Sequence, residues 1–354
     1  MAMASGTDNK AFQNLQISLN NLALQASAPE QLMPQVGVLE AVTSPANTQG
    51  LAALQFEVLN GKDKPQNTSG KPYVQVRSVA PDCTYTNTGS KNICTAETGA
   101  SDPFVYTNVT VDQEAWREFT IDHSTFANLD YTPNEMIALK TAQACQNILT
   151  QINNSLVTLI YAQAGDYPSG GDSASSPKGV SIISSAGAYQ PLALSQVITE
   201  YRKNGFAGKP IAVGGSKLET ARMAAMYQGT GQFTSPYNPG LPVDLFTDYV
   251  LDTTLGNSIE NMITWMPGTV RLVEWFKNEK YNALNLETHK ANKIMYGGFE
   301  FDCDIVYTCD KTWKFTISKP YGLFHVTEAM YDTCWDPGIL AWELTCAGLN
   351  CTSF

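Results

Sequence analysis

The strongest pattern along the chain is a stripe of apolar residues at helical spacing in its middle. Between residues 134 and 163 the apolar positions recur every three or four residues, as on one face of an α-helix. Pro133 suits the first turn of a helix, and Gly165 follows the last periodic position. The pattern predicts one helix of roughly 30 residues, or about 45 Å, which is longer than the average globular helix. Its predicted buried face consists of Ala138, Ala142, Cys145, Ile148, Leu149, Ile152, Leu156, Leu159 and Ile160.

Alternation with a period of two occurs earlier in the chain, on both sides of a polar segment. Apolar and other positions alternate over residues 73–77 and again over 104–111. The segment between them, 81–103, is rich in Thr, Asn, Ser and Gly. This predicts a long two-stranded excursion with a large polar tip. Because an isolated two-stranded hairpin is marginal in water, we expect it to lie on another domain or another chain.

The first fifty residues contain two stretches of different character. Phe and Leu residues at helical spacing predict an amphipathic helix over residues 9–24. Residues 27–49 are polar, contain Pro and have no sustained period, so we predict an extended arm there.

The remaining chain combines a helical unit with many predicted strands. A helix is predicted over 195–204 and a short strand over 211–213. Another helix opens at Ser216, with Glu219 in the position that completes a capping box. Residues 229–255 are predicted as loops with short strands. The C-terminal third is predicted to be mostly β, with strands over 270–275, 299–308, 312–318 and 323–327.

The composition excludes several classes of protein. The 354 residues include 22 Lys and Arg against 33 Asp and Glu, a net charge of −11, and only 16% are charged. A typical globular protein has about 25% charged residues. With 43% hydrophobic residues the chain is too apolar for a disordered protein. Its acidic balance argues against a protein that grips nucleic acid through phosphates, which requires clustered Lys and Arg.

The sequence shows no targeting segment. No basic stretch followed by an apolar one begins it, and no run of about 18 apolar residues occurs. We expect a chain that is made in a cytoplasm and is not inserted in a membrane.

The cysteines and histidines lack the spacing of common sites. None of the eight Cys is in a Cys-x-x-Cys pair, so the usual zinc and redox signatures are missing, and most are expected to be reduced core residues. His123, His289 and His325 are far apart, and no Gly-x-Ser-x-Gly elbow occurs. We therefore predict neither a metal site nor a hydrolase site.

Two segments resemble phosphate-binding loops. Residues 205–210 contain Gly-Lys, but Pro210 stands where Ser or Thr would bind magnesium, and a strand follows instead of preceding the loop. Residues 214–217 lie between a predicted strand and a helix, where free N–H groups could hold an anion. A plain helix cap is the simpler interpretation of the second segment.

Two clusters of charged residues complete the search for chemistry. Asp302, Cys303, Asp304, Cys309 and Asp310 lie close in sequence, and in a strand Glu300, Asp302 and Asp304 would share one face. Such carboxylates could bind a hard cation, although a solvated strand face is commoner. Residues 275–281 interleave Lys with aromatic residues, as single-strand binding platforms do, but acidic residues surround them. No catalytic, cofactor-binding or metal-binding residue is assigned.

The order of the predicted parts is the most informative feature. An N-terminal helix and arm, a long β excursion, one spine-like helix, a helix–strand–helix unit and a β-rich end follow one another. This order resembles the tailed-phage major capsid protein of the Hong Kong 97 fold. The resemblance implies an α+β fold whose parts are an N-terminal arm (1–55), an extended E-loop (56–120), a P-domain (121–190) with its spine helix (134–163), an A-domain (191–268) and a β-rich return (269–354).

The resemblance implies a structural protein and not an enzyme. The chain would self-assemble as hexamers and pentamers into an icosahedral shell around double-stranded DNA, which it would contact non-specifically at most. It would be assembled in the bacterial cytoplasm and end in the virion. Low charge and many small polar residues suit large contacts between subunits, because charged groups are depleted in interface cores. An encapsulin-like nanocompartment shell is the alternative in the same fold, and an anion- or nucleotide-binding α/β enzyme is the alternative in another class.

The resemblance also leads to expectations about partners and covalent bonds. The N-terminus has no long charged helical extension, so we expect a separate scaffolding protein, together with a portal. Some members of the fold crosslink an E-loop lysine to a neighbouring subunit, but nothing marks a lysine here as reactive. Cys83 and Cys94 flank the tip of the excursion and could form a disulfide that stabilises it by about 2–3 kcal/mol. A reducing cytoplasm opposes this bond, whereas the surroundings of a released virion favour it.

Overall fold

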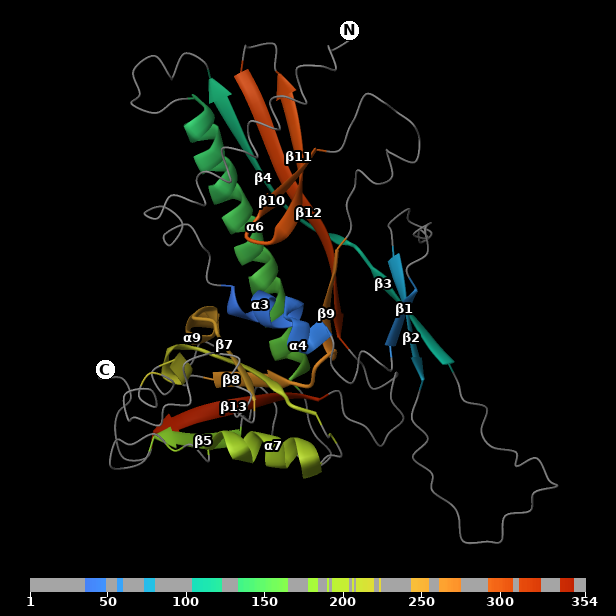
Figure 1. Ribbon diagram of the computed structural model, residues 1–354, viewed down its shortest axis with the longest axis vertical. Coiled ribbons are helices and arrows are strands. Elements are labelled where there is room, and N and C mark those ends of the chain that lie inside the picture. The colour runs from blue at the N-terminus through green and yellow to red at the C-terminus, as the bar shows by residue number, and fades with distance from the viewer. Residues whose placement is uncertain are drawn as a thin grey trace, which may run out of the picture. The chain divides into compact units, whose positions relative to one another are not determined.

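The computed structural model describes sixteen stretches of the chain and assigns them to two compact units (Figure 1). The first unit contains Met1–Val36, Val111–Asn154 and Val273–Gly322, and the second contains Gly37–Thr110, Ser155–Leu272 and Leu323–Phe354. Helices and mainly antiparallel strands are mixed in both, which confirms the α+β class. The described residues are 36–48, 56–59, 73–79, 104–122, 133–164, 178–183, 190, 193–203, 206, 208–219, 223, 243–254, 261–274, 292–307, 312–325 and 338–346.

The first unit is built on one antiparallel sheet. Its strands follow the order β10-β11-β12-β4, and β9 (Val270–Glu274) also pairs with β12. Direct cross-strand pairs such as Ile294↔Phe301 and Phe315↔Phe119 define the register, and the two Phe rings of the second pair are stacked 4.9 Å apart. The strands are β4 (Gln113–Asp122), β10 (Asn292–Tyr296), β11 (Phe299–Tyr307) and β12 (Thr312–His325).

The apolar face of this sheet and the first part of helix α6 (Pro133–Gln163) form the core of the first unit. Cys145 of α6 lies near Cys303 of β11, and both thiols are buried. The predicted helix is confirmed. Every residue of its predicted stripe is buried except Leu159, which is partly exposed. No helix in the described part of the chain is long and apolar enough to cross a membrane.

Strand β12 corrects one prediction. The sequence predicts separate strands over 312–318 and 323–327, but one strand runs from Thr312 to His325. Pro320 and Gly322 resemble the end of a strand, yet Pro320 pairs with Glu114 of β4 and lies beyond Ser318, the last residue of β12 that pairs with β11. The missing N–H of Pro320 therefore breaks no bond between β12 and β11.

The second unit contains a five-stranded sheet with the order β5-β13-β8-β6-β7. Helix α7 (Ala193–Lys203) contributes Leu194, Val197 and Tyr201 to the buried cluster that covers one face of this sheet. The helix confirms the prediction over 195–204, and β6 confirms the strand predicted over 211–213. The strands are β5 (Lys178–Ile183), β6 (Ile211–Gly214), β7 (Asp244–Thr247), β8 (Asn261–Trp265) and β13 (Ile339–Cys346).

The N-terminal part of the second unit is helical, so the prediction of an extended arm over 27–49 is wrong for residues 37–48. Helices α3 (Gly37–Thr43) and α4 (Pro45–Thr48) replace it, and Val38 and Leu39 are buried. Gly37 allows the close approach of α3 to β7, because a Cβ atom there would collide with the carbonyl of Thr247. Short helices such as these depend on tertiary contacts, which the local sequence does not reveal.

Two buried polar side chains hold these helices in place. The Asp248 carboxylate accepts a hydrogen bond of 3.0 Å from the N–H of Val38 and one of 3.0 Å from Val250 at the start of α9 (Val250–Thr254). The Asn47 amide donates to the carbonyls of Val42 (2.7 Å) and Val270 (2.9 Å). The amide oxygen of Asn47 accepts two hydrogen bonds. One comes from the indole N–H of Trp265 at the end of β8 (3.3 Å), and the other comes from the backbone N–H of Gly268 in the turn before β9 (2.9 Å).

Candidate assembly interface

The predicted excursion forms a small sheet of its own. Strands β2 (Tyr73–Val79) and β3 (Phe104–Thr110) pair antiparallel from Tyr73↔Thr110 to Val79↔Phe104. A third strand that the sequence did not predict, β1 (Phe56–Leu59), pairs with the other edge of β2. The two-stranded prediction is therefore corrected to three strands in the order β1-β2-β3.

This small sheet has two open edges. Within the described residues, its strands pair with one another and with no strand of either five-stranded sheet. Among the described strands, neither β1 nor β3 has a second partner, and strand edges of this kind commonly recruit another chain. The predicted tip, with Cys83 and Cys94, lies outside the described residues, so the disulfide remains a prediction.

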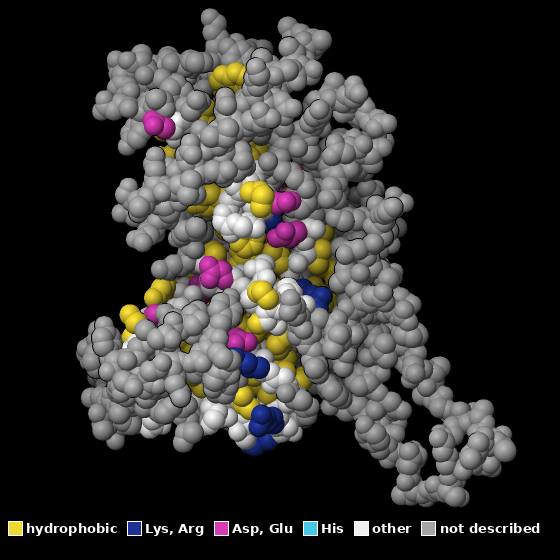
Figure 2. Space-filling view, viewed as in Figure 1, with side chains coloured by type: hydrophobic (Ala, Val, Ile, Leu, Met, Phe, Trp, Pro, Cys, Tyr) yellow, Lys and Arg dark blue, Asp and Glu magenta, His cyan; other side chains and the backbone are white. Residues whose placement is uncertain are grey.

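The sheet of the first unit has a face opposite its apolar one, and that opposite face carries large apolar side chains among polar ones. Trp116 of β4 is 55% exposed and Met295 of β10 is 52% exposed. The Glu118 carboxylate and the Lys314 ammonium form an ion pair of 2.8 Å on the same face as Trp116. Figure 2 shows such a mixture of hydrophobic, acidic and basic side chains on the described part of the face that it presents. Exposed apolar groups within a polar surround are typical of protein–protein contacts.

The described residues of the acidic strand form no cation site. By register, Asp302, Ser318 and Trp116 lie in one row across the sheet, and Asp302 is only 2% exposed. The expectation of a solvated face is therefore wrong for Asp302, although Asp304 is exposed. No group of three His, Cys, Asp or Glu residues among the described ones could hold a metal ion. Cys309 and Asp310 lie outside the described residues.

Of the two loops that resemble phosphate sites, the segment 214–217 has the more suitable context, and a carboxylate of the same chain binds its backbone. Both carboxylate oxygens of Asp252 lie 3.1 Å from the backbone nitrogen of Ser216, which donates to them. Gly215 leaves room for this carboxylate, because a Cβ atom there would overlap it. The helix-cap interpretation of residues 214–217 is thus confirmed, with Asp252 as the capping group. Glu219, which the sequence placed in a capping box, accepts a hydrogen bond of 2.9 Å from the Thr247 hydroxyl.

The other candidate residues have structural contacts or lie outside the described part. Lys209 of the first look-alike loop forms an ion pair with Asp244. His325 is half buried at the end of β12, and this burial lowers its pKa. Residues 275–281 and the histidines at positions 123 and 289 lie outside the described residues.

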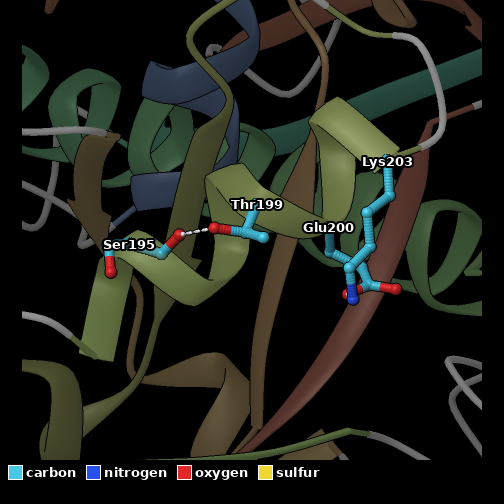
Figure 3. Close-up of polar contacts among 4 residues, drawn as sticks. All are labelled: Ser195, Thr199, Glu200 and Lys203. Carbon is cyan, nitrogen blue, oxygen red and sulfur yellow. Dashed lines mark hydrogen bonds and ion pairs between the residues drawn. The ribbon is translucent and has the colours of Figure 1, made fainter.

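Helix α7 carries polar contacts between its own side chains and backbone (Figure 3). The Thr199 hydroxyl donates to the Ser195 carbonyl at 2.9 Å, and the exposed Lys203 pairs with the buried Glu200 at 3.2 Å. These contacts stay within one helix, between residues three or four positions apart. They stabilise α7 and bring no nucleophile next to a base.

The two buried thiols of the first unit, Cys145 and Cys303, are held in the protonated form. Burial raises the pKa of Cys303 to about 12, and the nearby carboxylates of Asp304 and Asp302 add to this. Burial and the neighbouring Cys303 raise the pKa of Cys145 further, against a smaller opposite effect of Lys319. Neither thiol is ionised near neutral pH, so neither provides a thiolate nucleophile.

Sequence reasoning missed two cationic side chains with unusual surroundings. The Lys319 ammonium, on the apolar face of β12, bonds to Glu274 at 3.0 Å and to the Glu300 carbonyl at 2.9 Å. It also lies over the rings of Phe299 and Phe301, at 5.7 and 5.5 Å from their centroids. Along β12, Lys319 stands in alternation with the apolar residues Phe315 and Ile317. This alternation in the sequence could have predicted that Lys319 is buried. The second cation, Arg271 of β9, carries no such signal in the sequence.

The chain is similar to several solved structures. No family model matches the sequence, and no curated protein matches it. Solved structures do match: a chain from Mycobacterium phage Che8 is 9% identical with a TM-score of 0.47, covering 81% of this chain and 91% of that one. The capsid of the cyanophage P-SCSP1u is 12% identical with a TM-score of 0.44, covering 83% and 91%. The virus-like particle from Pyrococcus furiosus is 11% identical with a TM-score of 0.43, covering 94% and 99%.

Proposed function

We propose that this chain is the major capsid protein of a tailed phage and that it self-assembles into the shell that encloses the genome. The observation that carries the proposal is the small sheet β1-β2-β3, which forms its own hydrogen-bonded unit at the predicted position of the E-loop. A sheet this small gains stability when one of its faces is covered, and a neighbouring copy of the chain can cover it. The long helix α6 follows this sheet in sequence, as the resemblance requires.

The surface of the first unit supports contacts between copies. Trp116 and Met295 are large apolar side chains that are more than half exposed on the same face of one sheet. Tryptophan is among the residues that contribute most to binding energy at protein interfaces. We infer that this face is covered when copies of the chain assemble.

The proposal includes a structural, non-enzymatic role in the virion. Hexamers and pentamers would build the shell in the bacterial cytoplasm, with a separate scaffolding protein and a portal as partners. The net charge of −11 limits binding to packaged DNA, since like charges repel. The contact of Asp252 with the backbone nitrogen of Ser216 weakens support for the α/β enzyme alternative, whose candidate anion site was the segment 214–217.

Electron microscopy of the purified protein tests the proposal. We expect shells, rings or sheets in negative stain, whereas a monodisperse monomer with measurable nucleotide affinity would contradict it. Trp116→Lys should reduce assembly while leaving the far-UV circular dichroism spectrum unchanged. Gln143→Lys, at an exposed position of α6, is the matched control and should assemble normally.

An encapsulin-like shell is the second candidate, since it has the same fold and differs in its contents. Particles purified after nuclease treatment distinguish the two. Protected double-stranded DNA, with portal and terminase genes beside this gene, supports the capsid. Enclosed cargo enzymes without DNA support the nanocompartment.

A further inference from the structure

The exposed face of the sheet in the first unit surrounds a tryptophan with carboxylates. Trp116 is 55% exposed. Glu114 and Glu118 share its face of β4, each about 7 Å away along the strand, and both are exposed. By register, the exposed Asp304 of β11 lies in the same row across the sheet as Glu118. Lys314, the partner of Glu118, neutralises one of these three charges. The face therefore combines an aromatic ring with an excess of negative charge.

These surroundings favour one kind of ligand, a cationic side chain. A guanidinium group over the ring of Trp116 gains a cation–π attraction. The carboxylates of Glu114 and Glu118, on either side of the ring along β4, can accept its hydrogen bonds. A DNA phosphate would instead meet like charges on this face.

The second unit presents cations of this kind. Among the residues whose side chains the structure describes, the exposed cations are Arg117, Arg202 and Lys203. Arg117 directly follows Trp116 along β4, so it lies on the other face of that strand. Arg202 and Lys203 are the last two residues of α7, and the Lys203 side chain is 65% exposed although it pairs with Glu200. The end of α7 is thus the described place where another copy can offer adjacent cations.

The end of α7 is held in a fixed position. The N–H of Phe206 donates to the carbonyl of Tyr201 at 3.0 Å, which is the bond that closes a Schellman motif after a helix. The rings of the same two residues meet edge to face with centroids 5.9 Å apart, and Tyr201 is fully buried. Arg202 therefore extends from a rigid backbone, and less conformational freedom is lost when it binds.

We propose that the Trp116 face of one copy binds Arg202, with Lys203 beside it, at the end of α7 of a second copy. The opposite charges of two surfaces on the same chain argue for this occupant. Because the two surfaces differ, the contact is head-to-tail, and repeated head-to-tail contacts close a ring when their rotation permits. This inference rests on the proposed function, since it needs copies of the chain to meet in a shell.

Reversing the charge on each surface tests the contact. Glu114→Lys and Arg202→Glu should each raise the subunit concentration needed for half-maximal shell formation at least about tenfold, with an unchanged far-UV circular dichroism spectrum. An equal mixture of the two variants should assemble within about threefold of the wild-type concentration, because each variant offers the charge that the other lacks. Asn147→Lys, at an exposed position of α6, is the control and should assemble as the wild type does.

The possible failures can be told apart. A wild-type protein that forms no shells overturns the proposed function and this contact with it. If shells form and neither reversal impairs them, only the contact is overturned. Rescue when both substitutions are in one chain, but not when the variants are mixed, places the contact within one copy and overturns the proposal. A defect that neither combination rescues assigns the face to another partner and also overturns it.

The wild-type protein provides a test that does not depend on the folding of the variants. Raising the NaCl concentration from about 0.05 M to about 0.5 M screens charges on exposed surfaces. The subunit concentration needed for half-maximal assembly should then rise at least about tenfold. Assembly that is insensitive to salt would overturn the contact and leave the proposed function standing.

Discussion

The phenol oxygen of Tyr201 and the hydroxyl oxygen of Thr264 lie 2.9 Å apart in the core of the second unit. Tyr201 also donates to the Gly338 carbonyl at 3.1 Å, and the Trp342 indole donates to Thr264 at 2.8 Å. Every hydrogen is used if Trp342 donates to Thr264, Thr264 to Tyr201, and Tyr201 to Gly338. This chain of bonds connects helix α7 with strands β8 and β13.

Thr264→Val should lower the free energy of unfolding by about 2 kcal/mol, because it removes the buried hydroxyl that accepts the hydrogen bond of the Trp342 indole. Tyr201→Phe should cost about 1 kcal/mol. Urea unfolding of both single variants and the double variant measures their coupling. The two losses should not add, since the residues share one bond. Thr199→Val, on the exposed side of α7, is the control, and a comparable loss there would contradict a special role for Thr264.

Asn47→Ala should lower the free energy of unfolding by about 3 kcal/mol. The substitution leaves two carbonyls and two N–H groups without their partner, all in buried surroundings. Asn147→Ala, at an exposed position of α6, changes the same side chain and should cost less than about 0.5 kcal/mol. Equal losses in the two variants would show that the four bonds of Asn47 contribute little.

Glu40→Gln should stabilise the protein at pH 7, and the gain should shrink as the pH falls. Burial, and then the charge of Asp248, raise the pKa of Glu40 above its ordinary value of 4.5. The folded state therefore binds the proton more tightly, so the penalty is full above the raised pKa and vanishes below 4.5. Thermal melts at pH 7 and pH 4 measure it. Adding Asp248→Asn should reduce the gain, and a gain that is independent of pH would refute the explanation.

Removing Glu274 from its ion pair with Lys319 should lower the free energy of unfolding more than removing Lys319 does. Glu274→Gln leaves the buried ammonium without its counter-charge and should cost about 2 kcal/mol. Lys319→Met places an apolar side chain beside Phe299 and Phe301 and frees a carboxylate that is one-third exposed, so it should cost less than about 1 kcal/mol.

The exposed pair Lys314–Glu118 is the control for this asymmetry. Glu118→Gln should change the stability by less than about 1 kcal/mol, since surface ion pairs contribute little. If Lys319→Met proves more destabilising than Glu274→Gln in denaturant unfolding, the contribution of Lys319 is packing and not charge.

Cys145 and Cys303 should resist alkylation in the folded protein. Both thiols are buried and protonated, so iodoacetamide at pH 8 should modify them at least about a hundredfold more slowly than in urea. Peptide mass spectrometry measures each residue separately. Rapid modification of the native protein would show that the core between α6 and β11 opens readily. The same maps report whether Cys83 and Cys94 are free or joined.

The features that the sequence predicted well are those that repeat over many residues. Helix α6 contains enough turns for its apolar stripe to stand out, and α7 ends as predicted. In contrast, α3 and α4 are too short to show a period, and they depend on Asp248, which lies 210 residues from Val38. Such a partner is visible only when the chain is folded.

The polar residues of the candidate site were the hardest to predict. Pro320 and Gly322 resemble a strand end, but the register of β12 lets the strand continue through them. Asp302 was expected on a solvated strand face, yet it is buried, and Lys319, for which the sequence suggested no role, is buried as well. Their burial depends on which elements cover them and not on the local pattern, since charged residues are buried only with suitable partners.

The position of β13 constrains the order in which the second unit can form during synthesis. This strand pairs in parallel with β5 and antiparallel with β8, so it joins β5 to the remaining strands. Until the ribosome has made residues 339–346, β5 has no partner strand in that sheet. The remaining strands β8, β6 and β7 can pair with one another, but the edge of β8 that later pairs with β13 stays open. A chain that stops before Ile339 therefore cannot complete this sheet, and the unpaired strand edges that it exposes make an incomplete chain prone to aggregate.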